Sequence, residues 1–129
     1  MIAGAPCPCG TGAPYPACCG RWHDGPMRLA APDAEALMRS RYAAYAVGDE
    51  RYLLDTWHPS TRPAGLALEH DATKWLGLEV RARRRIDDTH ATVEFVARSR
   101  VRGRGMRLHE TSRFVREAGR WLYVDGELR

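Results

Sequence analysis

The sequence predicts an α+β fold in which helices pack on one face of a curved antiparallel sheet, preceded by a small cysteine-rich module. Three observations predict it. Four cysteines lie within the first nineteen residues. Apolar residues then recur at helical spacing as far as residue 57, and from residue 76 they alternate with charged residues at the period of a strand. We therefore divide the chain into a module at 1–26 and an α+β domain at 27–129.

The cysteines of the module have the pattern C-x-C followed by C-C, and they are Cys7, Cys9, Cys18 and Cys19. Four thiolates so close together can form a tetrahedral site, usually for Zn²⁺, although iron also accepts such ligands. The pairs are tighter than the C-x2–4-C spacing of common zinc fingers and ribbons. Two disulfides or a redox site are the alternatives. Disulfides need an oxidising compartment, for which this sequence gives no indication. Redox catalysis favours a C-x-x-C spacing, which these cysteines do not have. Metal binding is therefore the favoured interpretation.

Composition limits the classes of protein that the chain can form. Its 129 residues make one ordinary domain with a small appendage, and 44% of them are hydrophobic. No apolar run is long enough for a membrane span, and no signal peptide is visible, so we expect a cytoplasmic protein. The formal net charge is +4, and Lys74 is the single lysine among 20 basic residues. The arginines allow phosphate or RNA binding, but interleaved acidic residues favour a solvated surface.

Two helices follow the module. Asp33 comes after Pro32 and predicts the N-cap of a helix that Gly48 stops. Asp49 caps a second helix, which ends before the His58-Pro59 pair. Residues 59–72 form a long connection, in which a short helix around 64–70 is an option.

Period-two alternation then predicts an antiparallel meander of four strands. The strands cover residues 76–86, 91–97, 106–114 and 121–124. Matching the inward faces of the first hairpin also places opposite charges across from each other on the outward face. The predicted pairs are Ile86 with Ala91, Val80 with Ala97, Arg83 with Glu94, and Glu79 with Arg98. A basic cluster without nearby acids marks the second hairpin, at Arg100, Arg102, Arg104 and Arg107.

The segment from Cys7 to Gly20, CPCGTGAPYPACCG, resembles the SEC-C metal-binding motif, which ends the SecA translocase motor and recurs in small bacterial proteins. The resemblance implies that the four cysteines are the metal ligands and that the motif contacts a protein or ribosome partner. That family usually carries lysines around the aromatic residue, whereas this chain has Ala13, Pro14, Pro16 and Ala17. His23 lies close enough in sequence to Cys19 to compete as a ligand, although we expect it at the surface.

The order of the elements resembles the NTF2-like cone, a bent sheet wrapped around a helix. Five segments together look like the YchJ family, which joins a SEC-C motif to an NTF2-like domain. They are LMRSRYAAY at 37–45, TWHP at 56–59, WLGL at 75–78, VEFVA at 93–97, and residues 110–126. The resemblance implies the fold and the metal, and it implies no particular reaction.

A cone of this kind can hold a ligand pocket. On the predicted register Glu110 points inward, opposite Ala97, and Arg84 also falls on the inward face. A buried carboxylate must be paired or protonated, so Glu110 or His58 is a candidate general base. The candidate pocket residues are Arg41, Tyr42, Tyr45, Trp57, His58, Trp75 and Glu110. The alternative is a filled core in which Glu110 pairs with an arginine.

Three functions follow from this sequence. The leading one is a non-enzymatic accessory protein that contacts a protein or ribosome through its SEC-C module and binds a ligand or partner in the cone. The second is a small-molecule isomerase or hydrolase that uses the cavity. The third is RNA binding through the arginine-rich sheet edge. The outer sheet face could also form a homodimer.

Overall fold

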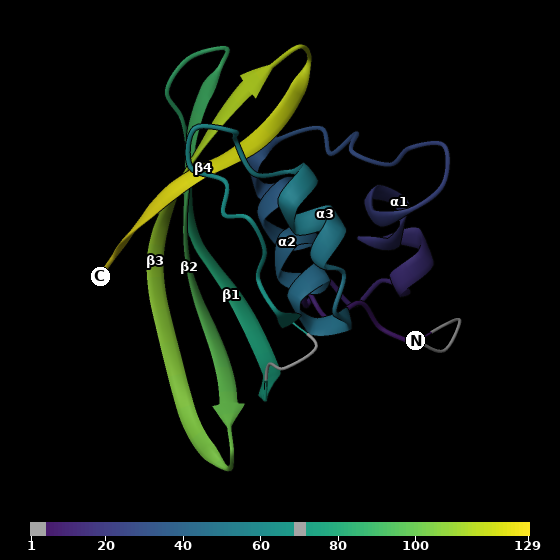
Figure 1. Cartoon of the computed structure of the whole chain (residues 1–129), viewed down its shortest axis with the longest axis vertical. Coiled ribbons are helices and arrows are strands. Elements are labelled where there is room, and N and C mark those ends of the chain that lie inside the picture. The colour runs from purple at the N-terminus through teal and green to yellow at the C-terminus, as the bar shows by residue number, and fades with distance from the viewer. Residues whose placement is uncertain (1–4, 69–71) are drawn as a thin grey trace.

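The computed structural model describes residues 5–68 and 72–129. Its helical elements are η1 (Tyr15–Ala17), α1 (Gly20–His23), α2 (Ala34–Val47) and α3 (Glu50–Asp55). Its strands are β1 (Thr73–Arg85), β2 (His90–Val101), β3 (Arg104–Glu117) and β4 (Arg120–Leu128). The strands form one antiparallel sheet in the order β1-β2-β3-β4 (Figure 1). The predicted α+β class and meander are confirmed.

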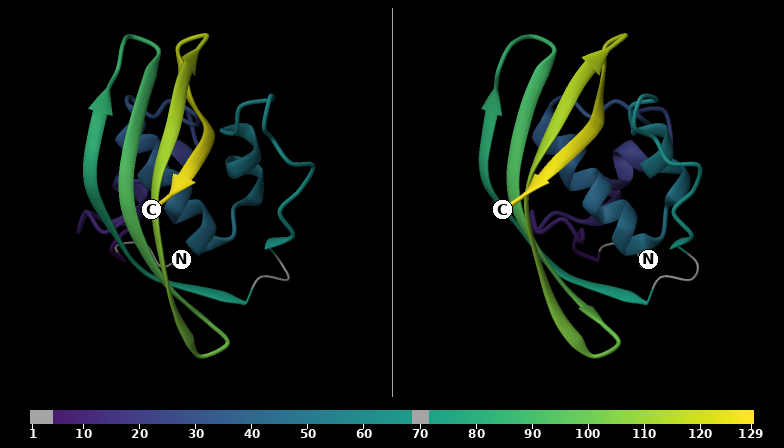
Figure 2. Two further views of the ribbon diagram at one scale, coloured as in Figure 1. Left: turned by 90° about the vertical axis from the view of Figure 1, so that its left-hand side faces the viewer. Right: turned by 60° about the vertical axis from the view of Figure 1, so that its left-hand side comes forward.

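The sheet curves around α2 and α3, which lie on its concave side (Figure 2). In Figure 1 these helices separate the sheet from α1 and η1 of the N-terminal module. The helix pair thus lies between the sheet and α1, while the cysteine cluster of the module also contacts Leu78 at the edge of the sheet. Among the described residues, no helix combines the length and the apolar character that crossing a membrane requires.

The predicted helix signals are confirmed at both ends of α2. The Asp33 carboxylate accepts a hydrogen bond from the Ala36 amide at 2.7 Å, as an N-cap does. Gly48 ends the helix with a φ of 80°, a conformation that favours glycine. Asp49 caps α3 by accepting from the Tyr52 amide at 3.1 Å. Residues 64–67 form no helix, and residues 69–71 lie outside the described part of the chain.

The predicted register of the first hairpin is wrong. Arg85 lies opposite Ala91 and Arg83 opposite Val93, one residue away from the predicted alignment. Irregularities between Trp75 and Gly77 and between Val80 and Ala82 then change the alignment twice more along β1. The predicted pairs, Ile86 with Ala91, Val80 with Ala97, Arg83 with Glu94 and Glu79 with Arg98, are therefore not formed as strand partners.

The shifted register reverses which side chains face the helices at the two ends of β1, whereas Leu78 and Val80 still pack against the core as predicted. Side chains directly opposite in a sheet share a face, so Arg83 and Arg85 lie on the concave side with Val93 and Ala91. Arg83 forms an ion pair with Glu35 of α2, and Arg85 lies over the ring of Trp121. Arg84, predicted to point inward, is opposite Thr92 on the other face. Ile86 is 57% exposed, because the strand ends before it.

Candidate metal centre and cavity

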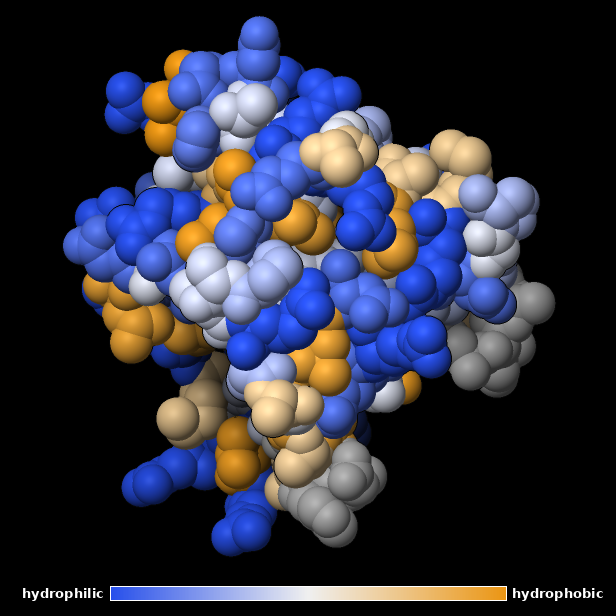
Figure 3. Space-filling model, turned by 45° about the horizontal axis from the view of Figure 1, so that its top comes forward, coloured by the Kyte–Doolittle hydropathy of each residue, from blue (hydrophilic) through white to orange (hydrophobic). Residues whose placement is uncertain are grey.

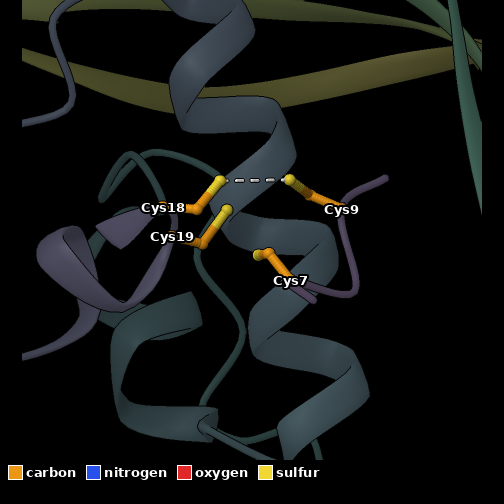
Figure 4. A group of neighbouring side chains, drawn as sticks. All are labelled: Cys7, Cys9, Cys18 and Cys19. Atoms are coloured by element: carbon orange, nitrogen blue, oxygen red, sulfur yellow. Dashed lines mark hydrogen bonds between the residues drawn. The ribbon is translucent and has the colours of Figure 1, made fainter. Parts of the chain in front are cut away.

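The four cysteines come together with their sulfur atoms pointing toward one another (Figure 4). Ala43 of α2 and Leu78 of the edge strand β1 pack against them. Their Sγ atoms all lie within 4.8 Å of one another, and each cysteine is 8% exposed or less. A loop closed by the hydrogen bond from the Cys7 amide to the Ala13 carbonyl (2.8 Å) carries one pair. The other pair, Cys18 and Cys19, lies between η1 and α1. A buried group of four thiols is therefore preformed by the fold.

Two glycines make this turn of the chain possible. Gly10 has a φ of 89°, which places the backbone after Cys9 in the left-handed region. At Gly20 a Cβ atom would lie 2.8 Å from the Tyr15 carbonyl oxygen, so only glycine allows this approach. Gly10 and Gly20 of the motif thus fix the loops that carry the cysteines.

The chemistry of the donor set fits a thiophilic divalent ion. Four sulfurs bound tetrahedrally at ~2.3 Å would lie about 3.8 Å apart, and Cys9 Sγ and Cys18 Sγ are already 3.6 Å apart. The thiols cannot all ionise together without a cation. Hydrogen bonds with Cys19 and Cys7 lower the pKa of Cys9, while hydrogen bonds with Cys7 and Cys9 raise the pKa of Cys19. A bound ion would release the remaining protons and supply the missing positive charge.

Contacts from α2 hold the cysteine cluster in place. Ala43 is fully buried against it, and the Arg39 Nη1 donates to the Cys9 carbonyl at 2.8 Å. Arg39 also binds Glu35, which in turn pairs with Arg83 of β1. The module is thereby connected to both α2 and the sheet.

His23 is neither at the surface nor free to act as a ligand, contrary to both expectations. It is 5% exposed, and its Nε2 lies 2.7 Å from the Ser40 carbonyl oxygen, so Nε2 must donate. Its Nδ1 then accepts from the Tyr15 hydroxyl at 2.6 Å. Burial lowers the pKa of His23, which agrees with a neutral ring that ties the module to α2.

A second feature, a cavity of about 290 Å³, lies between α2 and the concave face of the sheet. Six of the seven predicted pocket residues line it, namely Arg41, Tyr42, Tyr45, Trp57, Trp75 and Glu110. The predicted pocket lacked the other lining residues, which are Met38, Phe95, Ala97, Leu108, Ser112, Phe114 and Tyr123. Phe95, Ala97 and Phe114 fall on the inward face of their predicted strands, so the alternation of the sequence could have identified them as lining residues.

His58, the seventh predicted pocket residue, does not line the cavity. Its amide donates to the Tyr123 carbonyl at 2.7 Å, where the chain after α3 forms a bridge with β4. This contact directs the ring toward Ser60 (2.7 Å) and toward Glu117 (2.8 Å) at the end of β3. Glu110 is consequently the one predicted base that faces the cavity.

Arg41 is a buried cation in the cavity wall. It is 6% exposed, and its Nη1 donates to the Leu53 carbonyl at 2.8 Å and to Thr56 Oγ1 at 2.7 Å. The guanidinium carbon lies 4.9 Å and 4.6 Å from the ring centres of Trp57 and Tyr123. Burial lowers the pKa of Arg41 to about 10, so the side chain keeps its charge at neutral pH.

Glu110 lies opposite Phe95 and not, as predicted, opposite Ala97. It still faces the cavity, where its carboxylate accepts a hydrogen bond from Ser112 Oγ at 2.5 Å. Gly126 makes room for it, because a Cβ there would overlap the Glu110 carboxylate. The position of this carboxylate therefore depends on a glycine in the neighbouring strand.

Comparison with known proteins identifies the family of the chain. Residues 33–126 match the family described as "YchJ, middle NTF2-like domain". A UPF0225 protein of Bordetella parapertussis is 60% identical over 97% of this chain and 94% of its own length. A UPF0225 protein of Chromobacterium violaceum is 58% identical over 96% of this chain and 93% of its own.

Two solved structures share the fold and the cysteine motif. The solution structure of a SEC-C motif containing protein from Rhodopseudomonas palustris has a TM-score of 0.79 at 37% identity and covers 95% of this chain and 98% of that chain. The crystal structure of a SEC-C motif containing protein from Psychrobacter arcticus has a TM-score of 0.80 at 28% identity, over 100% of this chain and 86% of that one. The fold and the cysteines thus define an NTF2-like protein with a SEC-C motif. The chain belongs to the YchJ family, UPF0225.

Proposed function

We propose that this chain is a cytoplasmic, zinc-stabilised binding protein whose NTF2-like domain holds a small ligand in its cavity. The observation that carries the proposal is the hollow between α2 and the sheet, with the buried Arg41 and the half-buried Glu110 in its wall. A core built only for stability would be filled with side chains and would avoid two charged groups.

The zinc site has a structural part in this proposal. Cys7, Cys9, Cys18 and Cys19 are the proposed ligands, and all four are buried. The residues of α2 that meet the cysteine cluster, Arg39 and Ala43, lie on the opposite side of the helix from Arg41 and Tyr45 in the cavity. The ion would hold the module on α2, and α2 forms one wall of the cavity.

The first test is a titration of the ¹⁵N-labelled, zinc-loaded protein with small aromatic acids, amines and amino acids. We expect amide shifts concentrated around the cavity, at Phe95, Ser112 and Tyr123. Ala97→Phe fills the cavity from β2 and should abolish those shifts, whereas Ala17→Ser on the exposed module should keep them. Shifts confined to other surfaces, or shifts that survive Ala97→Phe, would refute ligand binding in the cavity.

A second candidate is contact with a protein or ribosome partner through the module. The observation that favours it is a shallow groove lined by Tyr15, Pro16, Arg21 and Met27, in which Met27 is 52% exposed. The face of the molecule in Figure 3 shows hydrophobic residues in small groups among hydrophilic ones. A Met27→Glu variant that still binds purified ribosomes as the parent does would refute this groove as the contact.

A further inference from the structure

The cavity wall contains two opposite charges, Arg41 and Glu110, that are not joined by an ion pair in the described part of the chain. The described hydrogen bonds of Arg41 all use Nη1, so its other guanidinium N–H groups have no acceptor among the described residues. Glu110 is hydrogen-bonded to Ser112 and forms no ion pair with Arg41 in the described part of the chain. A guanidinium that is buried among rings but has donors left over toward a cavity can bind a carboxylate or a similar acceptor.

The carboxylate of Glu110 limits what that acceptor can belong to. A simple anion placed beside Arg41 would bring a second negative charge into the same small cavity, where Glu110 would repel it. A ligand that also carries a positive charge would satisfy both groups at once. The charges of the wall therefore favour a zwitterion over an anion or a cation.

The remaining wall determines the body of the ligand. Aromatic rings dominate it, with Tyr42, Trp75 and Phe114 facing the hollow beside the rings stacked on Arg41. Such rings bind flat or apolar groups well. A volume of about 290 Å³ equals the space of roughly ten water molecules at ~30 Å³ each. That space suits one ring with a short polar head.

We propose that the cavity binds a small zwitterion with an aromatic body, of the aromatic α-amino acid class, with its carboxylate on Arg41 and its ammonium on Glu110. This inference rests on the proposed ligand-binding function. Arg41 and Glu110 are then the residues that select the ligand. Gly126 contributes indirectly, because its missing side chain leaves space for the Glu110 carboxylate.

The test compares four probes that share a phenyl ring, on the zinc-loaded full chain followed by NMR. L-phenylalanine has both charges, 3-phenylpropanoate lacks the ammonium, phenylalaninamide lacks the carboxylate, and benzyl alcohol has neither. We expect L-phenylalanine to bind at least tenfold more tightly than each of the others. Phenylalaninamide tests the contact with Arg41 by changing the ligand instead of the protein. A substitution of Arg41 would also break its hydrogen bonds to Leu53 and Thr56.

Variants of the carboxylate complete the test. Glu110→Gln should weaken L-phenylalanine at least tenfold and leave 3-phenylpropanoate unchanged or tighter. Gly126→Ala should act in the same direction, since its Cβ displaces the Glu110 carboxylate. Glu117→Gln, which alters a carboxylate outside the cavity that pairs with His58, is the matched control and should change neither affinity.

The two levels of the proposal fail in different ways. If 3-phenylpropanoate or benzyl alcohol binds in the cavity as tightly as L-phenylalanine, or if Glu110→Gln has no effect, the zwitterion is refuted and ligand binding stands. If none of the four probes shifts cavity resonances, the zwitterion is refuted too. Failure of the wider set of acids, amines and amino acids in the first titration then refutes ligand binding itself.

Discussion

His23 joins the module to the domain with a single side chain. Its ring contacts Tyr15 on one side and Ser40 of α2 on the other, and it packs against the ring of Tyr52 at 4.6 Å between centres. A neutral ring with its proton on Nε2 satisfies both contacts, since it donates to Ser40 and accepts from Tyr15 without placing a charge in the interior. A protonated ring would present a second donor to Tyr15 in place of an acceptor.

This geometry predicts an acid-sensitive loss of stability. Burial lowers the pKa of His23 in the folded chain below the ~6.5 of the unfolded chain. As the pH falls below about 6.5, the unfolded chain binds the proton first, so this part of the stability is complete above that pH and lost below it. We expect His23→Ala to lower the free energy of unfolding by about 2 kcal/mol at pH 7.5 and by less at pH 5.5. Urea unfolding in excess zinc measures both values.

His90 provides the control for that experiment. It is exposed and pairs with Asp87 in a turn, so His90→Ala should change the free energy of unfolding by about 0.5 kcal/mol or less. A loss for His23→Ala that is the same at both pH values would contradict the neutral, buried ring.

Prediction from sequence succeeded for residues whose chemistry depends on near neighbours in the chain. Spacing and alternation selected four cysteines that cluster and six residues that line one cavity, while their roles as metal ligands and ligand contacts stay predictions. His23 could not, because its burial depends on Ser40, seventeen positions away. His58 also could not, since a backbone contact with Tyr123 of β4 turns it away from the cavity.

At the scale of elements, α2 connects the two candidate sites. It presents small and polar residues to the cysteine cluster and long or aromatic residues to the cavity. Its position is therefore set by packing on both sides, and its first turn is fixed by the Asp33 cap. Helical period and cap residues are local signals, so the sequence predicts this helix closely.

The cap allows a quantitative prediction. Asp33→Ala removes the acceptor of the Ala36 amide and should lower the free energy of unfolding by about 1 kcal/mol. Urea unfolding followed by circular dichroism measures the change. Asp88→Ala, in the exposed turn between β1 and β2, is the matched control and should stay within about 0.5 kcal/mol of the parent. Equal losses in the two variants would indicate a general charge effect and contradict the cap.

Strand β1 shows where prediction from the sequence ends. The charge pairing that favoured the predicted register is worth only ~0.2–1 kcal/mol per exposed pair. A one-residue shift at the hairpin replaces the predicted register and brings Arg83 toward Glu35 and Arg85 over Trp121. Two irregularities then change the alignment again further along β1. These partners lie on other elements, so alternation within one strand contains no information about them.

At the scale of the whole molecule, the module depends on the domain as much as on a metal. Trp22 of the module packs in the main core, and Ala43 of α2 contributes to the cysteine cluster. Zinc binding would add its free energy only to the folded module. Loss of the ion should therefore lower the local stability of the module and of the side of α2 that it covers. The sheet should lose stability less.

Hydrogen exchange on the zinc-loaded chain and on the chelator-treated chain measures this distribution. We expect faster exchange at residues 7–23 and around Ala43 after chelation, with little change in the amides that pair β2 with β3. Cys19→Ser should reproduce the pattern without chelator, and chelator should then have no further effect on that variant. If exchange instead rises equally in the sheet, the chain unfolds as a single unit, and the ion stabilises the cavity as directly as it stabilises the module.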